Sequence, residues 1–186
     1  TPSDLVPLEV VVPVGVDPAL GTRGEAGRRI PVTIWSGSAD GYRLRLVEHD
    51  HAFAREGFYG GPDGDHADNG LRFTILGRAA LEAIRAEARP VDILHGHDWQ
   101  AGPAILSLRT RYAFDPLMAR AATIQTCHNL AYHGWVPRDR AWALDLPDDL
   151  GDLHGVDLLR ETVRIAEVVN TVSPTYAQES LTPEYS

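Results

Sequence analysis

The sequence predicts an α/β fold: an N-terminal β-meander followed by a Rossmann-like parallel sheet with flanking helices. Strand-like runs follow one another over the first 50 residues, with no helical pattern between them. Beyond residue 90, short apolar runs alternate with amphipathic helical patterns, which is typical of a parallel sheet. A chain of 186 residues fits one domain with a sizeable core.

The meander is predicted from three strand-like segments. Pro13 places the first at a sheet edge or a strand end, because proline cannot donate to a ladder. Alternating polar and apolar residues in the third predict a half-exposed antiparallel strand. Residues 15–29 predict a Gly- and Arg-rich connector, and residues 36–41 predict a turn. The expected strands are Leu8–Val14, Ile30–Trp35 and Tyr42–Glu48.

Residues 53–68 predict a long Gly- and Asp-rich loop, an uncommon length unless the loop is functional. Asp68 and Asn69 are expected to cap a helix that runs to about Ala88 and stops before Pro90. Further along, three buried parallel strands with helices on both faces are expected. These strands are Val91–His95, Ala121–Cys127 and Val168–Val172, and the helices are Trp99–Tyr112, Leu158–Glu167 and one opened by Ser173 and Pro174.

Composition excludes several classes of function. The formal net charge is −9, with no basic face or basic amphipathic helix, so we expect neither nucleic-acid nor membrane binding. All 17 positive side chains are Arg, which excludes Lys-dependent chemistry within these residues. The single Cys127 cannot form a disulfide within the chain, and it suits the reducing cytoplasm, where we expect the protein to work.

Polar residues gather where the predicted parallel strands end, and ligands bind outside the carboxyl ends of such strands. Asp98 follows the first strand and His128 follows the second, so both are candidates to face a ligand. Two structural alternatives stay open: Asp98 could be the N-cap of the next helix, and His128 could be a buried, hydrogen-bonded side chain.

His95 and His97 share one face of their strand, which permits metal ligation. A metal-dependent hydrolase using His95, His97 and His128 is therefore one alternative function. Packing of one or both beneath the loop is favoured over ligation, because a metal site needs three or four convergent ligands.

Four strings of residues resemble segments of bacterial glycogen synthases and plant starch synthases. They appear in the order of that family over about residues 50–186, whereas residues 1–49 match it only loosely. The four strings are Phe53–Gly60 continued by Asp68–Phe73, Val91–Gly102 with its His-x-His-Asp-Trp core, His128–Gly134, and Asn170–Glu179 continued by residues 182–185.

The resemblance implies a GT-B glycosyltransferase that moves glucose from ADP-glucose to the non-reducing end of an α-1,4-glucan with retention of configuration. No metal or other cofactor is required in that family. Residues 1–186 would then be a single, truncated N-terminal domain on the acceptor side, and the C-terminal nucleotide-binding domain would be absent from the chain. That missing domain is the expected partner, together with ADP-glucose and the glucan.

By the same resemblance, His128 would hydrogen-bond the transferred sugar, and Asp98 would contact the glucose or the acceptor hydroxyl. Tyr59 and Asn129 would line the same pocket, and Trp99 would offer a flat apolar surface for stacking against a glucan ring. A carboxylate at this place suits an oxocarbenium-like transition state, whose positive charge it could stabilise. Positioning is favoured over proton transfer for His128.

The chain departs from the family pattern in several places. The Lys-Thr-Gly-Gly-Leu segment that binds the donor diphosphate is missing, and His133 stands where the family usually has Gln. Arg160 and Glu161 stand where a Lys is usual. Because the donor site would lie between two domains, we expect the 186 residues alone to be catalytically inactive. A non-catalytic glucan-binding or interaction module of the same fold is the other alternative function.

Overall fold

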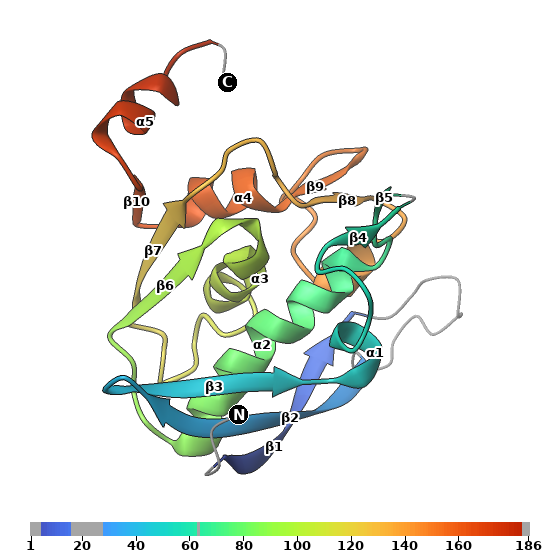
Figure 1. Cartoon of the computed structure of the whole chain (residues 1–186), viewed down its shortest axis with the longest axis vertical. Helices are drawn as coiled ribbons and strands as arrows, with labels where there is room; N and C mark the ends of the chain where they lie inside the picture. The colour runs from blue at the N-terminus through green and yellow to red at the C-terminus, as the bar shows by residue number, and fades with distance from the viewer. Residues whose placement is uncertain (1–4, 16–27, 63, 184–186) are drawn as a thin grey trace.

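The structure, a computed structural model, describes residues 5–15, 28–62 and 64–183. Most of the connector predicted over residues 15–29, and residues 184 and 185 of the last motif, lie outside these ranges. The α/β class is confirmed. A three-stranded antiparallel sheet and a three-stranded parallel sheet lie on either side of helix α2 (Asn69–Glu87), as Figure 1 shows.

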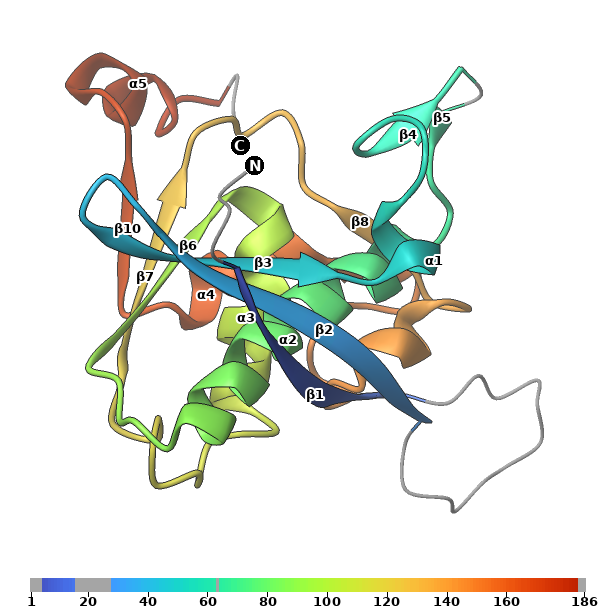
Figure 2. The same cartoon turned by 60° about the horizontal axis from the view of Figure 1, so that its bottom comes forward.

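The antiparallel sheet is the predicted meander. Strands β1 (Val6–Val14), β2 (Arg28–Ala39) and β3 (Tyr42–Glu48) pair in the order β1-β2-β3, with β1 and its Pro13 at an edge (Figure 2). The predicted turn over residues 36–41 is too long. The ladder continues to the Ala39–Tyr42 pair, and only Asp40 (φ 49°) and Gly41 (φ 87°) form the turn. An Asp-Gly pair with two positive φ angles is the favoured two-residue hairpin connection.

The segment predicted as a long loop is irregular over most of its length. It also contains the end of a short helix, α1 (Asp50–Phe53), and a two-stranded hairpin of β4 (Gly60–Gly61) and β5 (Gly64–Asp65). Helix α2 follows, as predicted. Asp68 occupies the N-cap position as predicted, but its carboxylate pairs with Arg55 and makes no cap hydrogen bond.

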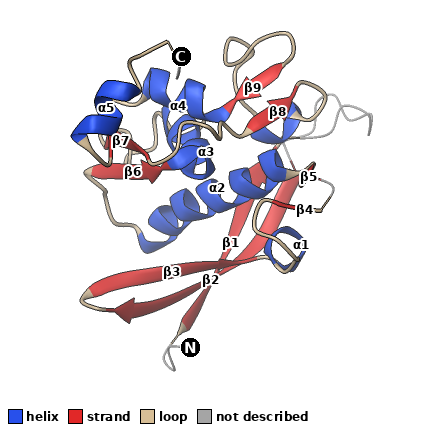
Figure 3. Ribbon diagram, turned by 45° about the horizontal axis from the view of Figure 1, so that its top comes forward, coloured by secondary structure: helices blue, strands red, loops and turns tan. Residues whose placement is uncertain are grey.

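The parallel sheet is built from β6 (Ile93–His97), β7 (Ala122–Cys127) and β10 (Val168–Thr171), in the order β10-β7-β6. Strand β6 begins two residues later than predicted. Helix α3 (Asp98–Arg109) packs beside β6 and β7 (Figure 3). Two predictions about this sheet are wrong for the described residues: helices do not cover both of its faces, and its third strand is not buried. Ile93 of β6 is 58% exposed, and Val168 of β10 is 50% exposed.

The remaining elements follow β7 and β10. Ser173 caps the last helix by accepting from the Tyr176 amide, and Pro174 occupies its first turn, as predicted. No helix within the described residues is long and apolar enough to span a membrane. The elements are β8 (Trp135–Pro137), the 3-10 helix η2 (Ala141–Leu144), β9 (Gly155–Asp157), α4 (Leu158–Ile165) and α5 (Pro174–Glu179).

Helix α2 joins the two sheets because it is apolar on more than one side. Ile75 and Ala79 pack against the inner valines and isoleucines of the meander, and Phe73 packs against Trp99 of α3. Gly77 allows the close approach of α3, since a Cβ there would lie 2.6 Å from the Ala104 nitrogen.

Arg78 of α2 is a fully buried cation at the junction of three elements. Its Nε donates to Ser107 Oγ of α3 at 2.9 Å, Nη1 donates to the Pro13 carbonyl of β1 at 2.8 Å, and Nη2 donates to the Leu144 carbonyl of η2. The nearest carboxylate oxygen, on Asp145, is 3.9 Å away. Burial lowers the pKa of Arg78 to about 10, and Asp145 opposes this shift.

Replacing Arg78 by Met should leave three polar atoms without their donor while filling a similar volume. We expect Arg78→Met to lower the free energy of unfolding by about 3–5 kcal/mol, because breaking a buried ionic network leaves its partners unsatisfied. Urea unfolding followed by circular dichroism measures this. Arg138→Met, at an exposed arginine, is the control, and equal effects of the two substitutions would contradict the role of Arg78.

Candidate active site at the carboxyl edge of the parallel sheet

The carboxyl ends of β6, β7 and β10 bring together residues that are far apart in the sequence. Parallel register pairs His97 with Thr126 and Asn170 with Thr126, so the three strands end level with one another. Asp98 and His128 follow directly from β6 and β7. The two residues lie close together, because the Asp98 carboxylate contacts the His128 backbone.

Asp98 acts here as a clamp on the loop that follows β7. Its Oδ1 accepts from the His128 amide at 2.6 Å and from the Asn129 amide at 3.3 Å. The Asp98 carbonyl accepts from Gln125 Nε2 at 3.1 Å. Asp98 also has a φ of 55°, in the left-handed region where Asp is tolerated better than most residues. The N-cap alternative is wrong, because the cap position is His97 and no side chain caps α3.

His128 is exposed, so the alternative of a buried histidine is wrong. Its Nε2 lies 2.9 Å from Nδ1 of His97. His95 and His97 share one strand face as predicted, and their rings stack at 4.4 Å. The expectation that they pack beneath the loop is wrong, because both are exposed on the sheet face that α3 does not cover.

A polar chain crosses the three strand ends. Thr126 Oγ1 donates to Asn170 Oδ1 at 2.6 Å, so it must accept from His95, whose Nε2 lies 2.7 Å away. His95 therefore carries its proton on Nε2. This series of hydrogen bonds was not anticipated from the sequence.

The metal-hydrolase alternative lacks its ligand set. Within residues 5–15, 28–62 and 64–183, no group of three or more His, Cys, Asp or Glu side chains is arranged to hold a metal ion. His97 and His128 face each other, but His95 directs Nε2 to Thr126. Three convergent ligands with supporting partners are the minimum for such a site.

Asn129 and His133 shape the loop after β7. Asn129 Oδ1 accepts from the Ala131 amide at 2.9 Å, which forms a local turn. Nε2 of His133 lies 2.8 Å from the Leu130 carbonyl, and its Nδ1 lies 2.6 Å from the Asp157 carboxylate. Both partners only accept hydrogen bonds, so both contacts are satisfied when the imidazole is protonated on both nitrogens. The sequence indicated no role for His133.

The stacking surface expected of Trp99 is not available. Its side chain is 6% exposed and packs edge-on against Phe73, with ring centroids 4.7 Å apart. Gly134, with a φ of 68°, lies over the indole, and a Cβ there would come within 2.2 Å of the ring. The indole is therefore an internal support, whereas the prediction treated an aromatic residue at a strand end as an exposed one.

Tyr59 also packs against Trp99, with ring centroids 6.0 Å apart. Its ring is 49% exposed and lines a cavity of about 450 Å³ with Phe58 and Arg72. Its carbonyl accepts from Asn69 Nδ2 and from the His66 amide, each at 2.8 Å. The structure thus places Tyr59 near the cluster through Trp99 rather than in direct contact with Asp98 or His128.

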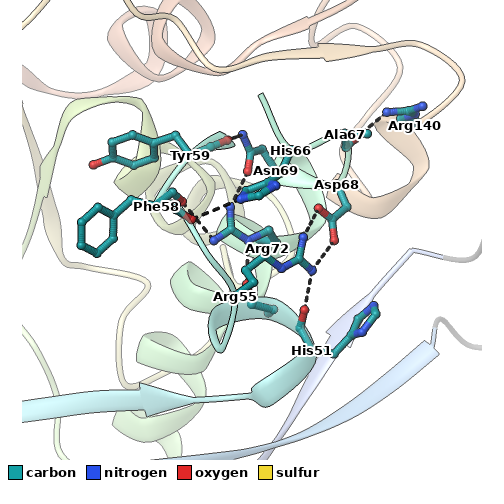
Figure 4. Close-up of polar contacts among 12 residues, drawn as sticks. His51, Arg55, Phe58, Tyr59, His66, Ala67, Asp68, Asn69, Arg72 and Arg140 are labelled. Carbon is teal, nitrogen blue, oxygen red and sulfur yellow. Dashed lines mark hydrogen bonds and ion pairs between the residues drawn. The ribbon is translucent and has the colours of Figure 1, made fainter. Parts of the chain in front are cut away.

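Two arginines hold the segment that carries Tyr59 (Figure 4). Arg72 is 4% exposed and donates to the Ala52 carbonyl at 2.7 Å, Asn69 Oδ1 at 2.6 Å and the Phe58 carbonyl at 3.0 Å. Arg55 donates to both Asp68 oxygens at 2.9 Å. Burial, followed by the nearby Arg55 charge, lowers the pKa of Arg72. Neither arginine was identified from the sequence.

The chain is similar to proteins of one family. The family model described as "Starch synthase catalytic domain" matches residues 8–186. A protein named glycogen synthase from Anaeromyxobacter dehalogenans (strain 2CP-1 / ATCC BAA-258) is 41% identical over 175 residues, which cover 89% of this chain and 35% of that protein. Another from Syntrophotalea carbinolica is 36% identical over 157 residues, covering 81% and 32%. The chain thus spans about a third of the length of these relatives.

A solved structure is similar as well. The catalytic domain of starch synthase IV from Arabidopsis thaliana, bound to ADP and acarbose, matches with a TM-score of 0.79 and 29% sequence identity. The match covers 98% of this chain and 36% of that one. It agrees with the predicted Rossmann-like class and with the GT-B fold that the resemblance implied.

The clamp formed by Asp98 predicts a contrast between two substitutions. Asp98→Asn keeps an acceptor oxygen and tolerates a positive φ, whereas Asp98→Ala loses the acceptor and is strained there. We expect the alanine variant to lose roughly 2 kcal/mol of protection from hydrogen exchange at the His128 and Asn129 amides. The asparagine variant should stay close to the wild type. Equal exchange in all three proteins would show that the carboxylate does not hold the loop.

Arg72 provides a test of how Tyr59 is held. Arg72→Met removes donors to two carbonyls and one amide oxygen, and we expect at least about 2 kcal/mol less protection at the His66 amide, which binds the Tyr59 carbonyl. The Ala177 amide in α5 should be unaffected and serves as the internal control. Unchanged exchange at His66 would mean that the segment is held by other contacts.

Proposed function

Because this chain belongs to the starch synthase catalytic domain family, we propose that it forms the acceptor-side half of a retaining glucosyltransferase. In the proposed reaction, glucose passes from ADP-glucose to the non-reducing end of an α-1,4-glucan. The observation that carries the proposal is the contact between the Asp98 carboxylate and the backbone of His128, at the strand ends where such folds bind ligands.

The relatives support both substrates. The bacterial relatives are named glycogen synthase, and the Arabidopsis catalytic domain was solved with ADP and acarbose. These relatives are about three times as long as this chain, and the chain contains no Lys to pair with a diphosphate. We therefore assign the diphosphate chiefly to parts of the full-length protein outside these 186 residues, which would form the second half of the cleft.

Transfer breaks the bond between the anomeric carbon and the ADP oxygen and forms a bond to the acceptor O4. The ADP oxygen leaves with the electron pair, and the acceptor proton passes to the departing phosphate. Positive charge develops at the anomeric carbon in the transition state. Because Asp98 Oδ1 holds two amides, Oδ2 is the oxygen proposed to face the sugar and stabilise that charge.

The other proposed site residues position the substrates. His128 is exposed and would orient the sugar hydroxyls through its ring, with Asn129 next to it. Tyr59, which packs against Trp99, would contact another part of the substrate. Trp99 would support Tyr59 from within the protein. The reaction as proposed needs no metal or other cofactor. Buried Cys127, whose pKa burial raises, would stay a thiol in the cytoplasm, where we place the protein.

Glucosyl transfer by the full-length protein that contains these residues tests the proposal. Labelled ADP-glucose and a maltooligosaccharide, in buffer with EDTA, should give an elongated glucan. Asp98→Asn should lower kcat on the order of 10²-fold or more while leaving the fold intact, because it removes the charge but keeps the loop clamp. His154→Ala, at an exposed histidine, is the control.

We expect the 186-residue chain alone to show no transfer. Glucan binding by the full-length protein without any turnover would refute the glucosyltransferase and favour a non-catalytic binding module. An Asp98→Asn variant as active as the wild type would refute the role assigned to the carboxylate.

A further inference from the structure

The imidazoles of His97 and His128 make a direct contact that has no role in the reaction as proposed above. Strand register sets His97 beside Thr126, and His128 follows two residues further along. The Nδ1–Nε2 distance is 2.9 Å, and the ring centroids are 5.2 Å apart. The His97 ring also stacks against the ring of His95, with centroids 4.4 Å apart. The His97 ring therefore contacts two other imidazoles: that of His95, and that of His128, the residue proposed to bind the sugar.

We propose that His97 is a positioning residue. It holds the His128 ring in one orientation and couples the tautomer of that ring to its own, so that Nδ1 of His128 is the nitrogen that faces the sugar. This rests on the proposed function, in which His128 orients the sugar. The role of His97 is distinct from that function. Its hydrogen bond engages Nε2 of His128, so Nδ1 is the ring nitrogen of His128 that stays available to a ligand.

Proton accounting makes the two tautomers interdependent. One hydrogen bond needs one N–H between the two nitrogens. If His97 donates through Nδ1, a neutral His128 carries its proton on Nδ1 and offers the sugar a donor. If His128 donates through Nε2, its Nδ1 offers the sugar an acceptor. A pair with one extra proton keeps the bond, but a pair with two extra protons has no acceptor between the rings.

The surroundings also oppose a second positive charge. Partial burial, followed by the neighbouring imidazoles of His95 and His128, lowers the pKa of His97, and the Asp98 carboxylate opposes this shift. The unfolded chain therefore binds a proton at this residue more readily, so stability should fall as the pH drops through about 6.5, the ordinary His value. His97 also lines a cavity of about 780 Å³ whose other charged residues are Arg43, Arg45, Glu87 and Arg89.

Substitutions that differ in the position of one polar atom test the proposal in the full-length protein. His97→Asn places an amide near the position of Nδ1, whereas His97→Gln places it near Nε2 and His97→Ala has none. We expect kcat to fall on the order of 10²-fold in the Gln and Ala variants, because a misplaced positioning group can cost that much. The Asn variant should retain most of the activity, and KM for ADP-glucose should change less than twofold in all three.

Nitrogen-15 NMR of the histidine rings tests the contact without any activity. In the 186-residue chain, we expect one N–H to be shared between His97 Nδ1 and His128 Nε2, which gives a scalar coupling between these two nitrogens across the hydrogen bond. His97→Asn should leave His128 in one tautomer, and His97→Ala should leave it as a mixture. His154, which is exposed and outside the pair, should show no such coupling in any variant.

The two measurements separate the positioning role from the proposed function. If the full-length wild type transfers glucose but the three His97 variants are equally active, the positioning role is overturned and the function stands. If the rings share one proton but the wild type transfers no glucose, the proposed function fails and the pair remains. Absence of a coupling between His97 Nδ1 and His128 Nε2 in the wild type would overturn the pair itself.

Discussion

Two buried guanidinium groups on helix α2 determine how the segments around it are arranged. Arg72 and Arg78 are nearly inaccessible to water, and neither has a carboxylate within normal hydrogen-bond distance. Each must therefore be solvated by protein oxygens, since an unpaired buried charge is too costly to retain. Carbonyls from β1, η2 and the segment after β3 supply that solvation. The helix thus fixes the backbone of distant segments as well as their side chains.

In the candidate site, too, a charged side chain fixes backbone groups, but here the charge is negative and the groups are amides. The Asp98 carboxylate binds two backbone amides of the loop after β7, and this fixes the backbone from which the His128 side chain projects. Side-chain contacts then refine the arrangement, through the His97–His128 pair and the chain from His95 to Asn170. Much of the site therefore depends on where strands β6 and β7 end, and less on any one rotamer.

Periodicity and turn residues predicted the elements well, because those signals are local. The meander, helix α2, the three parallel strands and the Ser173 cap follow from alternation, helical spacing and capping chemistry. The failures concern long-range competition. Asp68 has the sequence context of a cap, but Arg55, 13 residues away, binds its carboxylate more fully. Trp99 follows a strand end, yet Gly134 and Phe73 enclose it.

The same limits apply to the site. Asp98 and His128 could be identified because each directly follows a buried-strand pattern, and strand ends are where ligands bind. Their mutual contact depends on parallel register, which no local pattern specifies. Arg72 was out of reach for a different reason: an arginine at a helical position normally indicates a solvated face. Only the tertiary structure shows that carbonyls surround it.

The close approach of Gly134 to the Trp99 ring has an evolutionary consequence. Any side chain at position 134 would push the indole away, and the indole, next to Asp98 in the chain, packs against Tyr59. A change at this one glycine would therefore alter the spacing between two parts of the candidate site without touching a residue of either part. Positions 99 and 134 should consequently vary together or not at all among descendants of this protein, although they lie on opposite sides of strand β7 in the chain.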